Sequence, residues 1–327
     1  MTKVITFLFM FILLVSCASP SSITQSIPMS ATEFRVAAEE RIFWRDPNVP
    51  ANSSNDNWIK AKVLGFNDFH GNLNSRDIGG RPAGGAAVLA AYLKAEADEV
   101  NDRVIIVHAG DMVGASPPVS ALLHHEPSIE FLNLLANTKC TQRNLMAPDC
   151  NMVGTLGNHE FDAGQGEIFR LLNGGRHADV DSMAKDWAGV NVPYVSANII
   201  DEASGETILP PYVIKKIDGV EVAIIGAVVK NTPKHVAPKN VVGLEFIDEA
   251  AAINRYVAEL KAKNVHAIIV ALHQGLRQVT FGEKAVVGKG ELTGDIIDII
   301  KALDGEVDIV ISGHSHGYTN LLVTNNS

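Results

Sequence analysis

Apolar runs that end in polar, metal-binding residue types are the feature that most constrains how this chain can fold. Arg103–Ala109, with Val-Ile-Ile-Val at its centre, and Val307–Ser312 have the near-continuous apolar character of strands buried on both faces of a sheet. In α/β sheets, ligands bind just beyond the carboxyl ends of such strands. Five polar patches occupy such positions: Asn67–Gly71, Gly110–Asp111, Gly157–Glu160, His273 within Ala271–Gly275, and Gly313–His316.

Strands and helices alternate along the chain from Lys60 onward. Asp218-Gly219, between two strand-like segments, predicts a tight hairpin. Asp248 is the expected N-cap of an amphipathic helix that extends to Lys263. Further strands are expected at 61–66, 103–109, 152–156, 267–272 and 307–312, and further helices at 84–97, 127–136, 166–172 and 292–303. This order of βαβ units with one hairpin predicts an α/β sandwich, in which helices cover two sheets.

The charge of the chain limits the class of partner. The 327 residues carry a formal net charge of −10 and show no basic stripe, which argues against a nucleic-acid-binding surface. An anionic small-molecule substrate remains compatible with this charge, because bound divalent cations would dominate the local field.

The N-terminal residues resemble an export signal rather than part of the fold. Lys3 supplies a positive charge, and Ile5–Val15 is an apolar segment too short to span a bilayer comfortably. The sequence Leu-Val-Ser-Cys at 14–17 resembles a lipoprotein processing box, which would make Cys17 the lipidated N-terminus; the alternative is an ordinary signal peptide that contains a cysteine. We therefore expect a signal peptide at 1–17, a tether at 18–57, and a protein exported to the periplasm or cell envelope and anchored to the membrane by lipid.

The two remaining cysteines, Cys140 and Cys150, flank a short loop that contains a proline. In an oxidising compartment a disulfide between them is the expected state. The alternative is two unpaired thiols. Nothing near the pair completes a set of zinc ligands.

The first two patches offer carboxylates and one imidazole. Asp68 and His70 are two residues apart after a strand, so both side chains can point the same way and bind one metal; the alternative is a polar loop. Asp111 follows a buried strand and a glycine. A lone aspartate there could cap a helix, but beside the other patches it is better interpreted as a carboxylate that bridges two metals.

The third patch combines a neutral oxygen ligand with an imidazole. Asn158 could bind a metal while the adjacent His159 faces the substrate, with Asp162 orienting His159 and holding it protonated. We expect Glu160 and Phe161 to be structural, at a capping turn.

The last two patches supply three histidines. His273 alone would more often be a structural histidine, whereas His314 and His316 form a His-x-His pair between glycines, which favours metal binding. Six other histidines have no such context and are expected to be surface or core residues: His108, His124, His125, His177, His235 and His266.

Taken in chain order, the motifs resemble those of the calcineurin-like metallophosphoesterases, and more narrowly those of the bacterial 5′-nucleotidase and UDP-sugar hydrolase family. The resemblance extends from about Lys62 to Gly317 and implies a four-layer α/β/β/α sandwich. It is carried by Asn67–Gly71, His108–Asp111, Gly157–Asp162, His273 and Gly313–His316, together with Gly84–Ala87 at the start of the first helix.

The resemblance also implies a role for each motif residue. His159 would bind the phosphoryl group and stabilise charge on the leaving side, with Asp162 orienting it. A hydroxide that bridges the metals would attack phosphorus, so no separate base is implied. The implied ligands are Asp68, His70, Asp111 and His316 for one metal, and Asp111, Asn158, His273 and His314 for the other.

Members of that family continue beyond the His-x-His motif with further strands and a C-terminal domain that binds the nucleoside base. In this chain only Tyr318–Ser327 follow the motif. We therefore expect residues 58–327 to be the catalytic domain, lacking its last strands, and the nucleotide-binding domain to be absent or separately encoded.

The leading hypothesis is a two-metal phosphohydrolase of 5′-nucleotidase type that acts on phosphate esters of nucleotides. The mixed oxygen and nitrogen ligands suit Mn, Zn, Co or Fe. The alternatives are a 2′,3′-cyclic-nucleotide phosphodiesterase, a UDP-sugar hydrolase, or a truncated metal-binding lipoprotein without catalytic activity.

Overall fold

The computed structural model describes residues 5–11, 59–100, 103–177, 186–278, 286–287, 292–317, 319 and 321–322. The expected tether at 18–57 therefore falls outside the described residues. Cys17 also lies outside them, so its lipidation stays a prediction.

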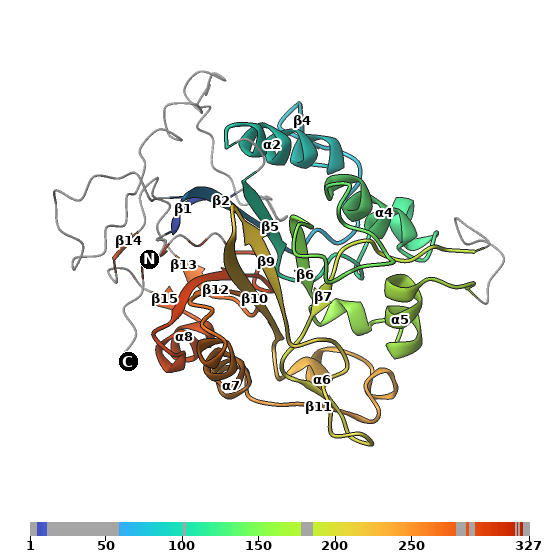
Figure 1. Ribbon diagram of the computed structural model, residues 1–327. Coiled ribbons are helices and arrows are strands. Elements are labelled where there is room, and N and C mark those ends of the chain that lie inside the picture. Colours follow the sequence, from blue (N-terminus) through green and yellow to red (C-terminus); the bar gives the residue numbers. More distant parts are fainter. Residues whose placement is uncertain are drawn as a thin grey trace.

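Two sheets form the centre of the fold (Figure 1). The first sheet has the order β1-β2-β5-β6-β7, and all its strands are parallel. The second has the order β16-β12-β10-β9, with only β9 antiparallel to its neighbour. The strands are β1 (Ile5–Phe11), β2 (Ile59–Phe66), β5 (Val104–His108), β6 (Met152–Thr155), β7 (Tyr194–Val195), β9 (Tyr212–Ile217), β10 (Val220–Val228), β12 (Ala267–His273) and β16 (Val307–Ser312).

Helices cover the outer face of each sheet (Figure 1). On the first sheet these are α2 (Ala86–Asp98), α4 (Glu126–Leu135) and α5 (Gln165–Asn173), and on the second α7 (Glu249–Ala262) and α8 (Ile296–Ala302). Short elements complete the described chain: β3 (Arg76–Ile78), β4 (Arg81–Ala83), α3 (Pro118–Ala121), η1 (His159–Phe161), β8 (Ile199–Asp201), α6 (Thr232–His235), η2 (Pro238–Asn240), β11 (Leu244–Phe246), β13 (Arg277–Gln278), β14 (Val286–Val287), β15 (Leu292–Thr293) and β17 (Leu321–Leu322).

The period-two alternation of the strands creates three apolar layers. In β2, Leu64 and Phe66 pack under the helices of the first sheet, whereas Ala61 and Val63 face the second sheet. The third layer joins the second sheet to α7 and α8. The order is therefore helix, sheet, sheet, helix, and the expected α/β/β/α sandwich is confirmed.

The structure also confirms the predicted hairpin and the predicted helix N-cap. Asp218 and Gly219 join β9 to β10 with positive φ angles of 47° and 82°, as a tight hairpin requires. The Asp248 carboxylate accepts a hydrogen bond from Ala251 N at 3.1 Å and caps α7. One boundary was wrong: Leu292 lies in β15, and α8 begins only at Ile296.

The apolar segment near the N-terminus contains β1, which lies parallel to β2 at the edge of the first sheet. A chain without residues 1–17 would lack β1 and would have β2 at that edge. The signal peptide stays a prediction. Among the described residues, no helix has both the length and the apolar character needed to cross a membrane.

Candidate metal centre

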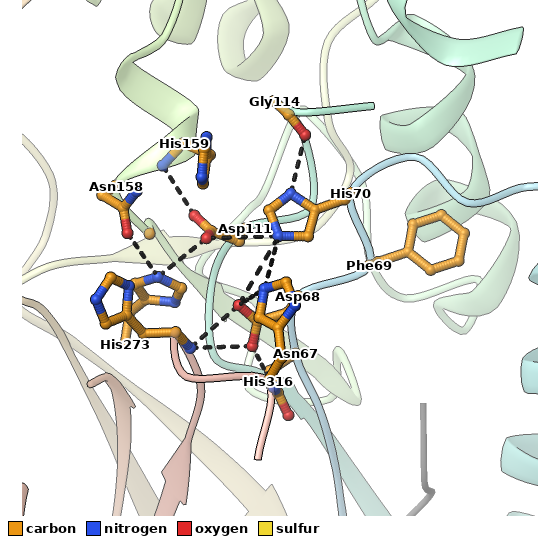
Figure 2. A network of polar contacts seen from close by, with 12 residues as sticks. Asn67, Asp68, Phe69, His70, Asp111, Gly114, Asn158, His159, His273 and His316 are labelled. Carbon is orange, nitrogen blue, oxygen red and sulfur yellow. Dashed lines mark hydrogen bonds and ion pairs between the residues drawn. The ribbon is translucent and has the colours of Figure 1, made fainter. Parts of the chain in front are cut away.

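The polar patches meet at one end of the two sheets. The loop after β2 is hydrogen-bonded to the loop after β5: His70 N donates to Asp111 O at 2.9 Å and Asp68 N donates to Gly110 O at 3.1 Å. Strands β6, β12 and β16 bring the other patches to the same end (Figures 1 and 2). Residues that are up to 246 positions apart in the chain thus become neighbours.

The first group of candidate ligands is Asp68, His70 and His316, whose ligand atoms all lie within 4.8 Å of one another. Nε2 of His70 and Nε2 of His316 are 3.1 Å apart, and Nε2 of His316 is 3.2 Å from Asp68 Oδ1 (Figure 2). Three donor atoms that converge on one point are the arrangement that a divalent cation needs.

The second group is Asp111, His273 and His314, within the same mutual distance. Asp111 Oδ2 lies 3.1 Å from Nε2 of His273 and 3.7 Å from Nε2 of His70, so one carboxylate oxygen lies between the two groups. Asn158 Oδ1 is 3.2 Å from Nε2 of His273. The structure therefore brings all seven expected ligands together, with Asp111 in the position of a bridge.

The backbone holds two of the imidazoles by their other nitrogens. Nδ1 of His273 lies 2.7 Å from Ala109 O, and Nδ1 of His70 lies 2.9 Å from Gly114 O. A proton on each Nδ1 leaves each Nε2 as the free acceptor that faces the cluster, which is the usual support for metal-binding histidines. The donor set and its orientation fit two divalent cations.

Several candidate ligands have unusual backbone angles. Asp68, His70, Asp111, His314 and His316 all have positive φ, between 47° and 69°. Residues other than glycine rarely adopt this conformation, and such strain is common at functional sites. The side chains of Asp68 and His70 therefore converge through loop geometry rather than through the alternation of a strand.

His159 lies at the exposed side of the cluster. Its backbone N donates to Asp111 Oδ1 at 2.9 Å, and its Nδ1 lies 2.8 Å from Asp162 Oδ2. The hydrogen bond to Asp162 raises the pKa of His159, against the opposing effect of burial. An imidazole with this partner favours the charged state, with its second nitrogen available to an anion.

Glu160 joins two of the motif loops. Its buried carboxylate accepts hydrogen bonds from the backbone N–H groups of Asp111 at 3.0 Å, Met112 at 2.8 Å and Gly157 at 2.5 Å. Burial, together with the charge of Asp111, raises the pKa of Glu160 to about 7. Its structural role is thus more specific than a helix cap, because it holds the loop of Asp111 against the loop of Asn158.

Two glycines permit this close approach. Gly110 has φ 83°, and a Cβ there would meet the backbone of Gly157, 2.5 Å from its N atom. A Cβ on Gly157 would collide with the Asp111 carboxylate. Only glycine therefore lets the ends of β5 and β6 bring Asp111 beside Asn158.

Neighbouring charges and burial shift the pKa values of the site histidines in opposite directions. Burial acts to lower the pKa of His273, but the negative charge of Asp111 prevails and raises it to about 9, so a metal ion that binds Nε2 would displace a proton from it. For His314 burial dominates and lowers the pKa to about 4. Asp111 stays ionised, because burial, which raises its pKa, is outweighed by His273 and its neighbours.

Two histidines outside the expected ligand set lie in different surroundings. His108 is fully buried between Phe66 and Tyr194, and burial lowers its pKa to about 3. His235 is exposed, but its ring lies 5.3 Å from that of His314. His235 was predicted to be a surface or core histidine, because the residues around it in the sequence give no signal that it lies at the rim of this site.

The model of the calcineurin-like phosphoesterase family matches residues 61–318, which include every strand that carries a patch. The chain belongs to the calcineurin-like phosphoesterase family. Membership agrees with the resemblance noted from the motifs, and the family is metal-dependent.

Curated relatives of this phosphoesterase cover most of its length. It is 34% identical over 301 residues to "Endonuclease YhcR" of Bacillus subtilis, 36% over 284 residues to "Cell wall protein Lmo0130" of Listeria monocytogenes, and 29% over 261 residues to a 5′-nucleotidase of Vibrio cholerae. These alignments cover 88%, 81% and 80% of this chain but only 22%, 34% and 41% of the relatives. The chain thus spans less than half the length of each of these relatives.

Solved structures agree with the fold of the phosphoesterase. The NAD nucleotidase of Haemophilus influenzae superposes with a TM-score of 0.54 at 22% identity, covering 78% of this chain and 38% of the nucleotidase. A 5′-nucleotidase precursor from Thermus thermophilus gives the same TM-score and identity, covering 41% of that chain. At this identity the likeness establishes the fold alone.

Proposed function

We propose that this phosphoesterase is a two-metal phosphohydrolase of 5′-nucleotidase type that hydrolyses phosphate esters of nucleotides. The observation that carries the proposal is the Asp111 carboxylate, whose Oδ2 lies between the two groups of candidate ligands. The 5′-nucleotidase among the relatives supports the choice of substrate class.

The proposed ligands are those expected from the motifs: Asp68, His70, Asp111 and His316 for one ion, and Asp111, Asn158, His273 and His314 for the other. Bound divalent cations would polarise phosphoryl oxygens and make water a better nucleophile at neutral pH. The oxygen and nitrogen donors suit Mn, Zn, Co or Fe.

His159 and Asp162 are the proposed catalytic pair. The Asp162 carboxylate accepts a hydrogen bond from Nδ1–H of His159 and favours the imidazolium, as the raised pKa indicates. A charged imidazole beside the ligand cluster can donate a hydrogen bond to a phosphoryl oxygen and stabilise the charge that develops on the leaving oxygen. Both side chains are about one-third exposed, which leaves them accessible to a substrate.

A second candidate is the hydrolysis of phosphodiesters. The relative named an endonuclease favours it, at 34% identity over 88% of this chain. The net charge of −10 argues against a nucleic-acid surface, so smaller diesters such as 2′,3′-cyclic nucleotides or UDP-sugars are the better candidates.

We also propose that the protein acts outside the cytoplasm. The relative named a cell wall protein and the leader-like residues 1–17 support export. Lipid attachment at Cys17 belongs to the same proposal.

The test starts with the chain from residue 18, stripped of metal and then resupplied with Mn²⁺, Zn²⁺ or Co²⁺. Phosphate release is measured from AMP, 2′,3′-cyclic AMP, UDP-glucose and a DNA oligonucleotide. We expect metal-dependent release, with AMP preferred and His159→Ala slower by about a hundredfold or more.

The alternatives give different results in the same assay. Preference for a diester would replace the nucleotidase assignment with the second candidate. A folded chain that binds metal but releases no phosphate from any of these substrates would instead identify a non-catalytic metal-binding protein.

A further inference from the structure

A second hollow lies at the opposite end of β5 and β6 from the metal centre. It is a cleft of about 350 Å³. Its walls come from the start of β5, the segment from Asn137 to Asn151, and the end of β9. A volume in this range suits a small ligand.

The most unusual side chain in this cleft is Lys215. Alternation along β9 places it on the same face as Val213 and Ile217, which pack in the apolar layer between the two sheets. The residue is only 1% exposed. A lysine in such a layer is rare unless its ammonium group has a partner.

The partners of Lys215 are too few for an ammonium group. Nζ donates one hydrogen bond, to Ala147 O at 3.0 Å, although it carries three N–H donors. No carboxylate of the described residues forms an ion pair with it. Burial lowers its pKa to about 8, and the charge of Asp149 opposes only part of that shift.

The lining of the cleft is basic in a chain that is acidic overall. Four cationic side chains line it against two carboxylates, those of Asp149 and Asp218. Two of the cations are already engaged, because Arg103 contacts Asp218 at 3.5 Å and Lys216 contacts Glu221 at 3.0 Å. Lys139 and Lys215 therefore form no ion pair with the described carboxylates, and Asp149 is the carboxylate of this lining whose charge still acts on Lys215.

The disulfide loop shapes one wall. Cys140 and Cys150 are bonded in the structure, and the loop between them is tied to β9 by two hydrogen bonds: Lys215 Nζ to Ala147 O at 3.0 Å, and Lys216 N to Pro148 O at 2.9 Å. The loop thus holds Lys139 and Lys215 at the same cleft.

We propose that this cleft is an anion site for a phosphate dianion, either free phosphate or the phosphate group of a small monoester. Lys139 and Lys215 outnumber the remaining carboxylate of the lining, Asp149, so an anion would gain net attraction there. Its oxygens would accept hydrogen bonds from the remaining N–H groups of Lys215. The site is separate from the metal centre, and its existence does not depend on the proposed hydrolysis.

Calorimetric titration of the full chain with inorganic phosphate tests this inference. The chain is titrated both metal-free and metal-loaded, because anion binding that depends on bound metal ions belongs to the metal centre and not to the cleft. We expect one binding event that does not require metal. Titration with AMP distinguishes the two sources: equal affinity indicates recognition of phosphate alone, and tighter binding of AMP indicates a monoester.

Three variants decide the location of the binding event. Lys215→Met keeps the length of the side chain and should weaken metal-independent binding by about tenfold or more, because a charged hydrogen bond is lost. Lys139→Glu changes an exposed residue, so it reports on the site even if Lys215→Met folds poorly, and it should also weaken binding. Lys94→Glu on α2 makes the same charge change away from the cleft and should bind like the unmodified chain. Absence of metal-independent binding, or equal affinity in Lys139→Glu and Lys94→Glu, would overturn the proposal.

Discussion

Buried charges have different partners at the two ends of the parallel strands β5 and β6. At the carboxyl ends, every charged ligand has a neighbour of opposite charge or a backbone partner: Asp111 faces two histidines, and His273 is held by Ala109 O. At the opposite end, Lys215 is equally buried but has a single carbonyl partner.

This difference shows how to interpret buried charge. A buried charge that is fully paired within the protein has a fixed orientation. A buried charge with unused hydrogen-bond donors lowers the stability of the folded protein unless a ligand binds to it. The charged groups of the candidate metal centre are paired with one another or with the backbone, whereas Lys215 in the cleft has unused donors. Four changes test whether this contrast holds.

The largest effect is expected at Asp111. Asp111→Asn removes the charge that faces both ligand groups, so metal-dependent phosphate release should fall by about a thousandfold or more. Asp218→Asn, a matched change at the opposite end of the molecule, should leave kcat within about twofold of the unmodified chain. Comparable losses in both variants would remove the distinction between the two ends.

Loss of the disulfide should act on stability rather than on catalysis. Replacing Cys140 and Cys150 by alanine opens a loop with a sequence separation of 10, which should lower the free energy of unfolding by about 2–3 kcal/mol. Denaturant unfolding measures this change. Activity at 25 °C should stay the same, since the loop contacts β9 and not the metal centre; a parallel loss of activity would contradict this separation.

Lys215→Met should stabilise the protein at pH 7 in phosphate-free buffer. The pKa of the folded state, about 8, lies below the ordinary value of 10.5, so the buried ammonium lowers stability fully below pH 8. Between pH 8 and 10.5 the folded chain loses the proton first, and that penalty disappears. We expect a gain of about 2–3 kcal/mol at pH 7 that shrinks across this window. A variant that is less stable at pH 7 would show that the lysine is well solvated or paired.

The smallest effect is expected at Asp162. Asp162→Asn removes the partner that raises the pKa of His159, so kcat should fall about tenfold. Activity that needs protonated His159 falls as pH rises through its pKa, and in the variant this fall should occur at a lower pH. A pH–rate profile that does not move would exclude His159 as the titrating group.

Strand runs and turn residues made most of the fold predictable. The hairpin at Asp218-Gly219, the N-cap at Asp248 and the layers on either side of each strand follow from local rules that need no knowledge of the partner segments. The start of α8 was predicted too early. Leu292 continues the apolar pattern of the helix in the sequence, but in the structure it lies in β15 and pairs with β13.

The chemistry of the site could be predicted from residue types, but its geometry could not. The motifs taken together, through their resemblance to the phosphoesterase family, implied the candidate ligands, whereas His273 by itself would have been interpreted as structural. Three features of the geometry depend on segments that are distant in the chain. They are the left-handed backbone at Asp68 and His316, the hydrogen bonds from two loops to Glu160, and the position of the His235 ring beside His314.

The amino-acid sequence by itself determines the family, the order of elements and the types of donor atom, since these depend on local patterns of polarity and turn chemistry. The packing of two sheets determines which donor atoms lie close enough together to hold an ion and which charges lack ion-pair partners. Asp111 becomes a bridging candidate and Lys215 an unmatched cation only when strands far apart in the chain lie side by side, because distance and burial, rather than residue type, set the energy of a charge.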